Sequence, residues 1–203
     1  MKKTSVFLLV ALIFTISSSF AQAPSSSPEL TKFLSKNLRY PTDLRQANVE
    51  GPVIIMIQID PKGDMTGEYQ FLSGDPAFKN EMARTVKILK ENWDSSFLDD
   101  KNYNQEYLMS FQFKLSKGQE FSPNPFTKTS KELKPISPLE TVNLAITNNP
   151  FSPTLYEQRA EIFKSKGNSM LAEMDQNQAQ FLKNKFITEI VIVGFPTYGP
   201  KSL

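Results

Sequence analysis

The sequence contains no histidine and no cysteine in its 203 residues. Without Cys it has no disulfide, no Cys nucleophile and no lipidated Cys of the bacterial lipoprotein type. Without His it has no Ser-His-Asp triad, and the lack of both residues excludes zinc fingers and haem held by His or Cys. These absences remove much of the enzyme repertoire. We expect a non-enzymatic protein with no cofactor and no metal; a hydrolase that uses paired carboxylates, which needs neither His nor Cys, is the alternative.

An excess of charge of one sign is also missing. Lys and Arg number 23 and Asp and Glu number 21, so the formal net charge is +2. A balanced chain has no overall field that would attract nucleic acid or an acidic membrane surface. We expect protein partners, no nucleic-acid partner, and only an indirect relation to membranes.

The first residues resemble an export signal. Two lysines precede Val6–Ile16, an uncharged apolar run, and small and polar residues follow it. This is the layout of a secretory signal peptide, and the run is too short for a comfortable transmembrane helix. We predict a signal peptide over residues 1–21 with cleavage after Ala21. Cleavage after Ala23 and retention as a membrane anchor are the alternatives.

A hairpin is predicted near the start of the region that spans residues 29–115. Val53–Ile59 reads VIIMIQI, a short β-branched run typical of a buried strand. Asp60–Gly63 reads DPKG, in which Pro favours the second turn position and Gly tolerates positive φ. Asp64–Ser73 is then the partner strand.

A helix and a third strand complete this region. Asp75 and Pro76 are typical of a helix start, and apolar residues at spacings of three and four follow at Phe78, Met82, Val86, Leu89 and Trp93. Tyr107–Leu115 alternates between apolar and more polar positions, as in a strand with one buried face. The sequence therefore predicts an α+β fold, with a three-stranded antiparallel sheet and helices on one face.

The remainder divides into a linker, a helical region and a strand. Residues 116–137 are rich in Pro, Ser, Thr and Lys and show no sustained period. Residues 138–185 have helical patterns, with Ala145 and Ala179 34 residues apart. Residues 186–203 are predicted to be a C-terminal strand and tail. Within them FITEIVIVGF is either an added edge strand, a strand exchanged with another chain, or a strand buried against the protein's own helices, which we favour.

The first region resembles the C-terminal domain of TonB, the periplasmic energy transducer of Gram-negative bacteria. Four segments appear in family order: RYP at residues 39–41, ANVEGPVIIMIQIDPKGDM at 47–65, LSGDPAF at 72–78, and the closing strand MSFQFKL at 109–115. The resemblance implies a two-layer α/β sandwich. It also implies that the domain binds extended N-terminal segments of outer-membrane receptors.

In this family the segment is added as a strand to the sheet, a mode called β-augmentation. The resemblance assigns this role to an exposed edge at the closing strand. The candidate binding residues are Tyr107, Met109, Ser110, Phe111, Gln112, Phe113, Lys114 and Leu115. A full transducer also carries a membrane helix with a coupling His, which this sequence lacks, so we do not expect energy transduction.

The helical region resembles a tetratricopeptide unit over LYEQRAEIFKSKGNSMLAEMDQNQAQ at residues 155–180. About one and a half units are present, whereas such repeats normally need ~3 for stability. We therefore favour docking on the first region or self-association over a free binding groove. Ile54, Met56 and Leu108 would lie on the sheet face opposite the main core and need a cover, which docked helices would provide. The alternative function is an envelope scaffold or assembly protein that acts through these helices.

Three further motifs carry no function. Residues 194–202 nearly spell a phosphate-binding loop, but Pro200 removes a backbone donor. Residues 60–67 superficially suggest a calcium loop, but Lys62 occupies a ligand position. Asp99 and Asp100 are adjacent carboxylates in a polar segment with no identifiable partner for acid–base chemistry.

Overall fold

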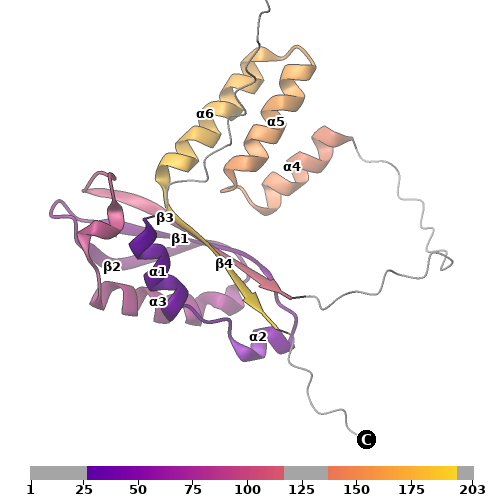
Figure 1. Cartoon of the computed structure of the whole chain (residues 1–203). Helices are drawn as coiled ribbons and strands as arrows, with labels where there is room; N and C mark the ends of the chain where they lie inside the picture. Colours follow the sequence, from indigo (N-terminus) through magenta and orange to yellow (C-terminus); the bar gives the residue numbers. More distant parts are fainter. Residues whose placement is uncertain (1–26, 117–136, 196–203) are drawn as a thin grey trace, which may run out of the picture.

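The computed structural model describes residues 27–116 and 137–195 (Figure 1). The predicted signal peptide, nearly all of the predicted linker and the C-terminal tail lie outside these residues. Within them, helices α1 and α3 lie on one side of a sheet, and helices α4, α5 and α6 form a separate group on the other side.

The hairpin, helix and closing strand of the first region follow in the predicted order, and two helices that were not predicted precede them. The region contains α1 (Pro28–Asn37), the short α2 (Thr42–Gln46), β1 (Gly51–Ile59), β2 (Met65–Ser73), α3 (Lys79–Glu91) and β3 (Gln105–Leu115). Single 3-10 turns precede and follow α3 at Pro76–Phe78 and Ser95–Leu98. Asp75 accepts a hydrogen bond from the Ala77 amide at 2.9 Å, which confirms the predicted start. Trp93 lies beyond the end of α3, and its indole donates to the Gly63 carbonyl at 2.8 Å.

The sheet differs from the prediction in strand number and direction. It has four strands in the order β2-β1-β3-β4, where β4 is Phe186–Gly194. β1 pairs antiparallel with both β2 and β3, as expected, but β4 pairs parallel with β3. The sheet is therefore mixed. The three-stranded antiparallel prediction was wrong because it treated the C-terminal strand separately from this domain.

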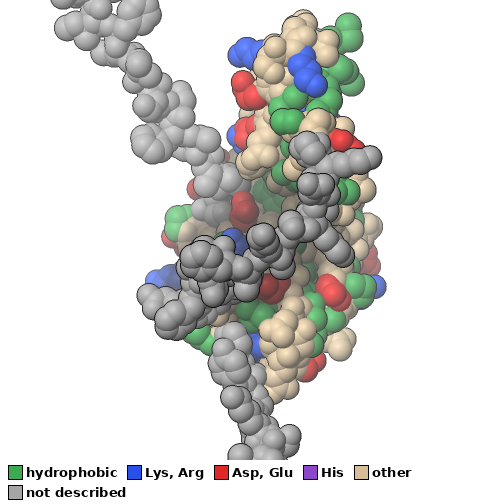
Figure 2. Space-filling model, turned by 90° about the vertical axis from the view of Figure 1, so that its right-hand side faces the viewer, with side chains coloured by type: hydrophobic (Ala, Val, Ile, Leu, Met, Phe, Trp, Pro, Cys, Tyr) green, Lys and Arg blue, Asp and Glu red, His purple; other side chains and the backbone are tan. Residues whose placement is uncertain are grey.

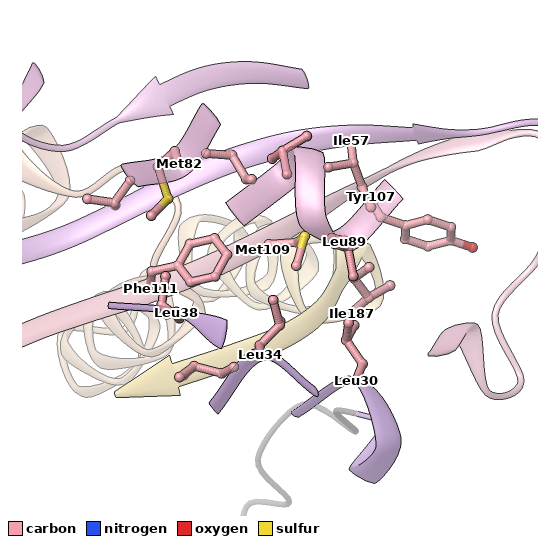
Figure 3. Close-up of a cluster of buried hydrophobic side chains, with 14 of the residues drawn as sticks. Leu30, Leu34, Leu38, Ile57, Met82, Leu89, Tyr107, Met109, Phe111 and Ile187 are labelled. Carbon is pink, nitrogen blue, oxygen red and sulfur yellow. The ribbon is translucent and has the colours of Figure 1, made fainter. Parts of the chain in front are cut away.

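The main core lies between the sheet and helices α1 and α3 (Figure 3). Alternate residues of β3 point into it, as the periodicity predicted. The C-terminal strand also contributes Ile187 and Ile190, which are 1% and 6% exposed. Figure 3 shows Ile187 facing Leu30 of α1. The core of the first region is thus completed by residues from the far end of the chain.

The helical region contains α4 (Pro138–Asn148), α5 (Pro153–Ser165) and α6 (Ser169–Lys185). One arginine ties these helices together. Arg159 of α5 donates to both carboxylate oxygens of Asp175 on α6, at 2.8 and 2.7 Å, and to Asn143 of α4 at 3.0 Å. Asp175 is buried, and its carboxylate raises the pKa of Arg159 through this charge-assisted hydrogen bond.

A second, smaller core joins this helical region to the sheet. Leu182 of α6 and Phe186 of β4 pack with Ile54 and Leu108 on the sheet face opposite the main core. Met56, Leu72, Phe151 and Tyr156 surround them as partly buried neighbours. The expectation that the helices cover Ile54, Met56 and Leu108 is therefore confirmed.

Candidate functional site

The predicted binding strand is internal in the sheet. β3 pairs with β1 on one side, from Gly51 opposite Phe113 to Ile59 opposite Gln105. On its other side it pairs with β4, from Leu108 opposite Phe186 to Leu115 opposite Gly194. The expectation that Tyr107–Leu115 presents a free edge is thus corrected, because the chain's own C-terminal strand occupies that edge.

The eight predicted residues lie together on this strand, but most of them do not reach solvent. Tyr107, Met109, Phe111 and Phe113 are buried in the main core. Ser110, at one of the more polar positions of the alternation, is 8% exposed. Gln112 and Leu115 are half-buried, and Lys114 is exposed. The Tyr107 hydroxyl donates to the Asn102 carbonyl at 2.6 Å, and burial raises the pKa of this tyrosine.

The pairing between β3 and β4 begins with an irregularity and then becomes regular. Leu108 is opposite Phe186 whereas Met109 is opposite Thr188, so Ile187 is an extra residue in β4. This bulge places both Ile187 and Thr188 on the core side. From Met109 and Thr188 onward the register is unbroken to Leu115 and Gly194. A final hydrogen bond runs from the Ser116 amide to the Gly194 carbonyl at 2.7 Å.

β4 continues directly from α6, since the helix ends at Lys185 and the strand begins at Phe186. Two lysines form hydrogen bonds between this junction and the sheet region. Lys185 donates to the Glu106 carbonyl at 3.2 Å, and Lys101 donates to the Asn184 carbonyl at 3.0 Å. Sequence reasoning recognised the strand but had no signal for its partner, because the partner depends on where the three helices return the chain.

A cleft of about 320 Å³ lies between the outer sheet face and the helical region. Ile54, Ser110 and Gln112 line its floor, and the turn between α4 and α5 forms its wall. Lys183 and Glu157 form an ion pair at its margin. The cleft is polar and apolar in similar measure and contains no convergent acid–base constellation among the described residues.

The charged side chains of the described residues form no metal site. No group of three or more Asp and Glu residues lies close enough together in these parts of the chain to hold an ion. Figure 2 shows acidic and basic side chains scattered over the visible face without a patch of one sign. In the same described ranges, no helix is sufficiently long and apolar to cross a membrane.

The comparison with protein families gives a match within the first region. Residues 36–115 match the family of the Gram-negative bacterial TonB protein C-terminal. The match extends from the end of α1 through β3 and covers less than half of the chain. TonB C-terminal domains are periplasmic, non-enzymatic protein-interaction domains. Helices α4–α6 and strand β4 lie outside the match, and neither a curated protein nor a solved structure matches the chain.

Proposed function

We propose that the protein is a non-enzymatic binding module of the periplasm that adds extended segments of envelope proteins to its sheet as strands. The resemblance of the first region to TonB indicates the N-terminal segments of outer-membrane receptors as the partners. The match over residues 36–115 carries this proposal. The pairing of β3 with β4 supports it, because this sheet already accepts an added parallel strand. Main-chain hydrogen bonds would supply affinity and side-chain contacts specificity.

The proposed location follows from the N-terminal sequence. Export directed by residues 1–21, with cleavage near Ala21, would release the protein into the periplasm. The proposed module binds its partner without transmitting force, since the sequence lacks the coupling His of a full transducer.

The role of Tyr107–Leu115 in this proposal is limited by β4. A partner could pair directly with β3 only after β4 had left, and Phe186, Ile187 and Ile190 would then lose their burial. Burial contributes ~1.5–3 kcal/mol for each large apolar side chain, so displacement would cost roughly 5–9 kcal/mol before new contacts form. The role of β3 in this proposal is therefore to hold β4 in the sheet.

The proposal is tested by peptide binding. The purified protein is titrated into labelled synthetic peptides that copy the N-terminal segments of outer-membrane receptors from the same envelope, and fluorescence anisotropy is recorded. Scrambled peptides of equal composition are the controls. We expect saturable binding to at least one native peptide and none to its scrambled form. Failure to bind any of them while circular dichroism shows a folded protein would contradict the proposal.

A second candidate function is an envelope scaffold that acts through the helical region. Met170, Met174 and Phe181 lie on one face of α6 and are 74%, 61% and 54% exposed. Exposed apolar groups of this kind are typical of interaction surfaces. Met174→Lys should then reduce crosslinking to envelope proteins, whereas Gln176→Lys on another face of α6 should not. Equal crosslinking of both variants and the unaltered protein would exclude this surface.

A further inference from the structure

The described part of the sheet has two open edges, β2 and β4, because each of these strands pairs on one side alone. An open edge presents unpaired backbone N–H and C=O groups that can pair with an added strand. The two edges differ in regularity, side-chain chemistry and protection.

The β2 edge is poorly suited to pairing. Its register against β1 shifts twice, between Ile54 and Ile55 and between Ile57 and Ile59. Lys90 of α3 donates to the Thr66 carbonyl of β2 at 2.6 Å, which occupies a backbone acceptor. Irregular register and a lysine at the edge are features that protect edge strands from added partners. The exposed positions Glu68 and Gln70 are also polar.

The β4 edge has the opposite character. Its register against β3 is unbroken from Thr188 to Gly194, so the strand is regular over that length. Phe186–Gly194 contains no Pro, Lys or Arg. Val191 and Val193 lie on the outer sheet face and are 54% and 55% exposed, and Phe195 beyond them is 69% exposed. Glu189 is a charged residue on this face, but from Val191 onward the strand is regular, apolar and accessible, although a soluble protein usually protects such an edge.

We infer that the outer edge of β4 is the pairing site for the partner segment, and that β4 itself remains in place during binding. The partner is an extended protein segment with β-branched or other apolar side chains at alternate positions, which pack beside Val191 and Val193. This inference rests on the proposed function and specifies its surface. The binding edge of the TonB-like sheet is thereby moved outward by one strand.

The position of β4 favours this arrangement over exchange. Its inner side chains belong to the main core, and its first residue, Phe186, packs with Leu182 of α6 in the second core. Removal of β4 would therefore disturb both cores and detach the end of α6. Addition at the outer edge disturbs neither of them.

A reversible disulfide between β3 and β4 distinguishes strand addition at the outer edge from displacement of β4. Ser110 and Glu189 are opposite each other on β3 and β4, on the outer sheet face, and Glu189 comes two residues before Val191 on that face. Because the native chain has no Cys, the Ser110→Cys/Glu189→Cys variant can form a single intended disulfide between adjacent strands. The probe is the receptor peptide that binds the unaltered protein best. We expect its affinity for the oxidised variant to match that for the same variant after reduction.

Two lysine substitutions, one on each edge strand, test which edge binds the peptide. Val191→Lys places a charge on the β4 edge, and Gln70→Lys places the same charge on the β2 edge. We expect Val191→Lys to weaken peptide binding about tenfold or more, because a charged edge disfavours strand addition, while Gln70→Lys leaves it nearly unchanged. Thermal unfolding of both variants, recorded by circular dichroism, establishes that they are folded.

Two results would overturn the inference. The first is loss of binding in the oxidised variant with recovery on reduction, which would mean that the peptide must displace β4. The second is equal binding by folded Val191→Lys and Gln70→Lys, which would place the site elsewhere. Absence of binding to the unaltered protein is a different result, since it contradicts the proposed function itself.

Discussion

At the scale of single residues, Gly74 is a position where both the backbone conformation and the neighbouring backbone exclude a side chain. Its φ is +118°, and a Cβ there would lie 2.7 Å from the Pro52 carbonyl oxygen and 2.9 Å from the Val53 Cα. Both contacts are with backbone, which cannot move aside as a flexible side chain can. The residue therefore controls how closely the end of β2 approaches the start of β1.

We expect Gly74→Ala to lower the free energy of unfolding by about 2–3 kcal/mol, through positive φ combined with the clash. Gly51 provides a matched control, since its φ is +137° but an added Cβ would meet nothing within 4 Å. Gly51→Ala should cost about 1 kcal/mol. Urea unfolding measures both, and equal losses would contradict the role of the close contact.

Asp60 is the residue that stabilises the hairpin turn. Its carboxylate accepts hydrogen bonds from the backbone amides of Asp64 at 2.9 Å and Lys62 at 2.8 Å. These bonds, that of Asp64 foremost, hold the pKa of Asp60 below its usual 3.8. A carboxylate with a lowered pKa stabilises the fold above its unfolded pKa and loses that contribution as the pH falls through the folded value.

The fold should therefore lose stability as the pH falls below about 4, the range of an unperturbed aspartate. Asp60→Asn should make the thermal midpoint depend less steeply on pH in that range. Near pH 7 the slope should be the same as in the unaltered protein. Asp43→Asn, at an exposed site in α2, is the comparison. An acid slope identical in Asp60→Asn and the unaltered protein would contradict the assignment.

At the scale of elements, β4 has two faces with different consequences for mutation. Ile187 is 1% exposed inside the main core, whereas Val191 is accessible on the outer face. The strand is therefore both a structural part of the TonB-like region and a surface of the molecule.

Ile187→Ala should lower the free energy of unfolding by about 3 kcal/mol, because it removes buried methyl groups and leaves a cavity. Val191→Ala should change it by less than about 0.5 kcal/mol, as at an ordinary surface position. Chemical unfolding followed by tryptophan fluorescence measures both through Trp93. If Ile187→Ala has an effect as small as Val191→Ala, β4 does not complete the core.

At the scale of the whole molecule, the two ends of the described chain are interdependent. The region that matches the TonB family ends at residue 115, but its sheet and core are completed by β4 from residues 186–194. A chain that ended at residue 116 would lose Ile187 and Ile190 from the core and expose the edge of β3.

We expect such a truncated chain to unfold at a lower denaturant concentration and to self-associate through the open β3 edge, which sedimentation velocity would detect. A synthetic peptide of residues 186–194 added in trans should restore the monomer, and a scrambled peptide should not. A truncated chain that stays monomeric and as stable as the full protein would contradict this dependence.

The sequence by itself determined the local structure of this protein. The hairpin at residues 53–73, the helix after Asp75 and the alternation of β3 were predictable because hydrophobic period, turn residues and caps act between near neighbours. Helices α4, α5 and α6 lie within residues 138–185, where helical patterns were recognised, for the same reason. The tetratricopeptide-like character of that region stays a prediction.

Tertiary structure alone decided the partner of the C-terminal strand. FITEIVIVGF was consistent with an added strand, an exchanged strand or a strand under helices, since β propensity does not specify the neighbour. Packing of Leu182 and Phe186 on the outer sheet face carries α6 to the rim of the sheet. The core-facing Ile187 and Ile190 then pair β4 with β3. The predicted binding edge became internal for this physical reason: a non-local pairing that buries apolar side chains on both faces outweighs any signal within the strand itself.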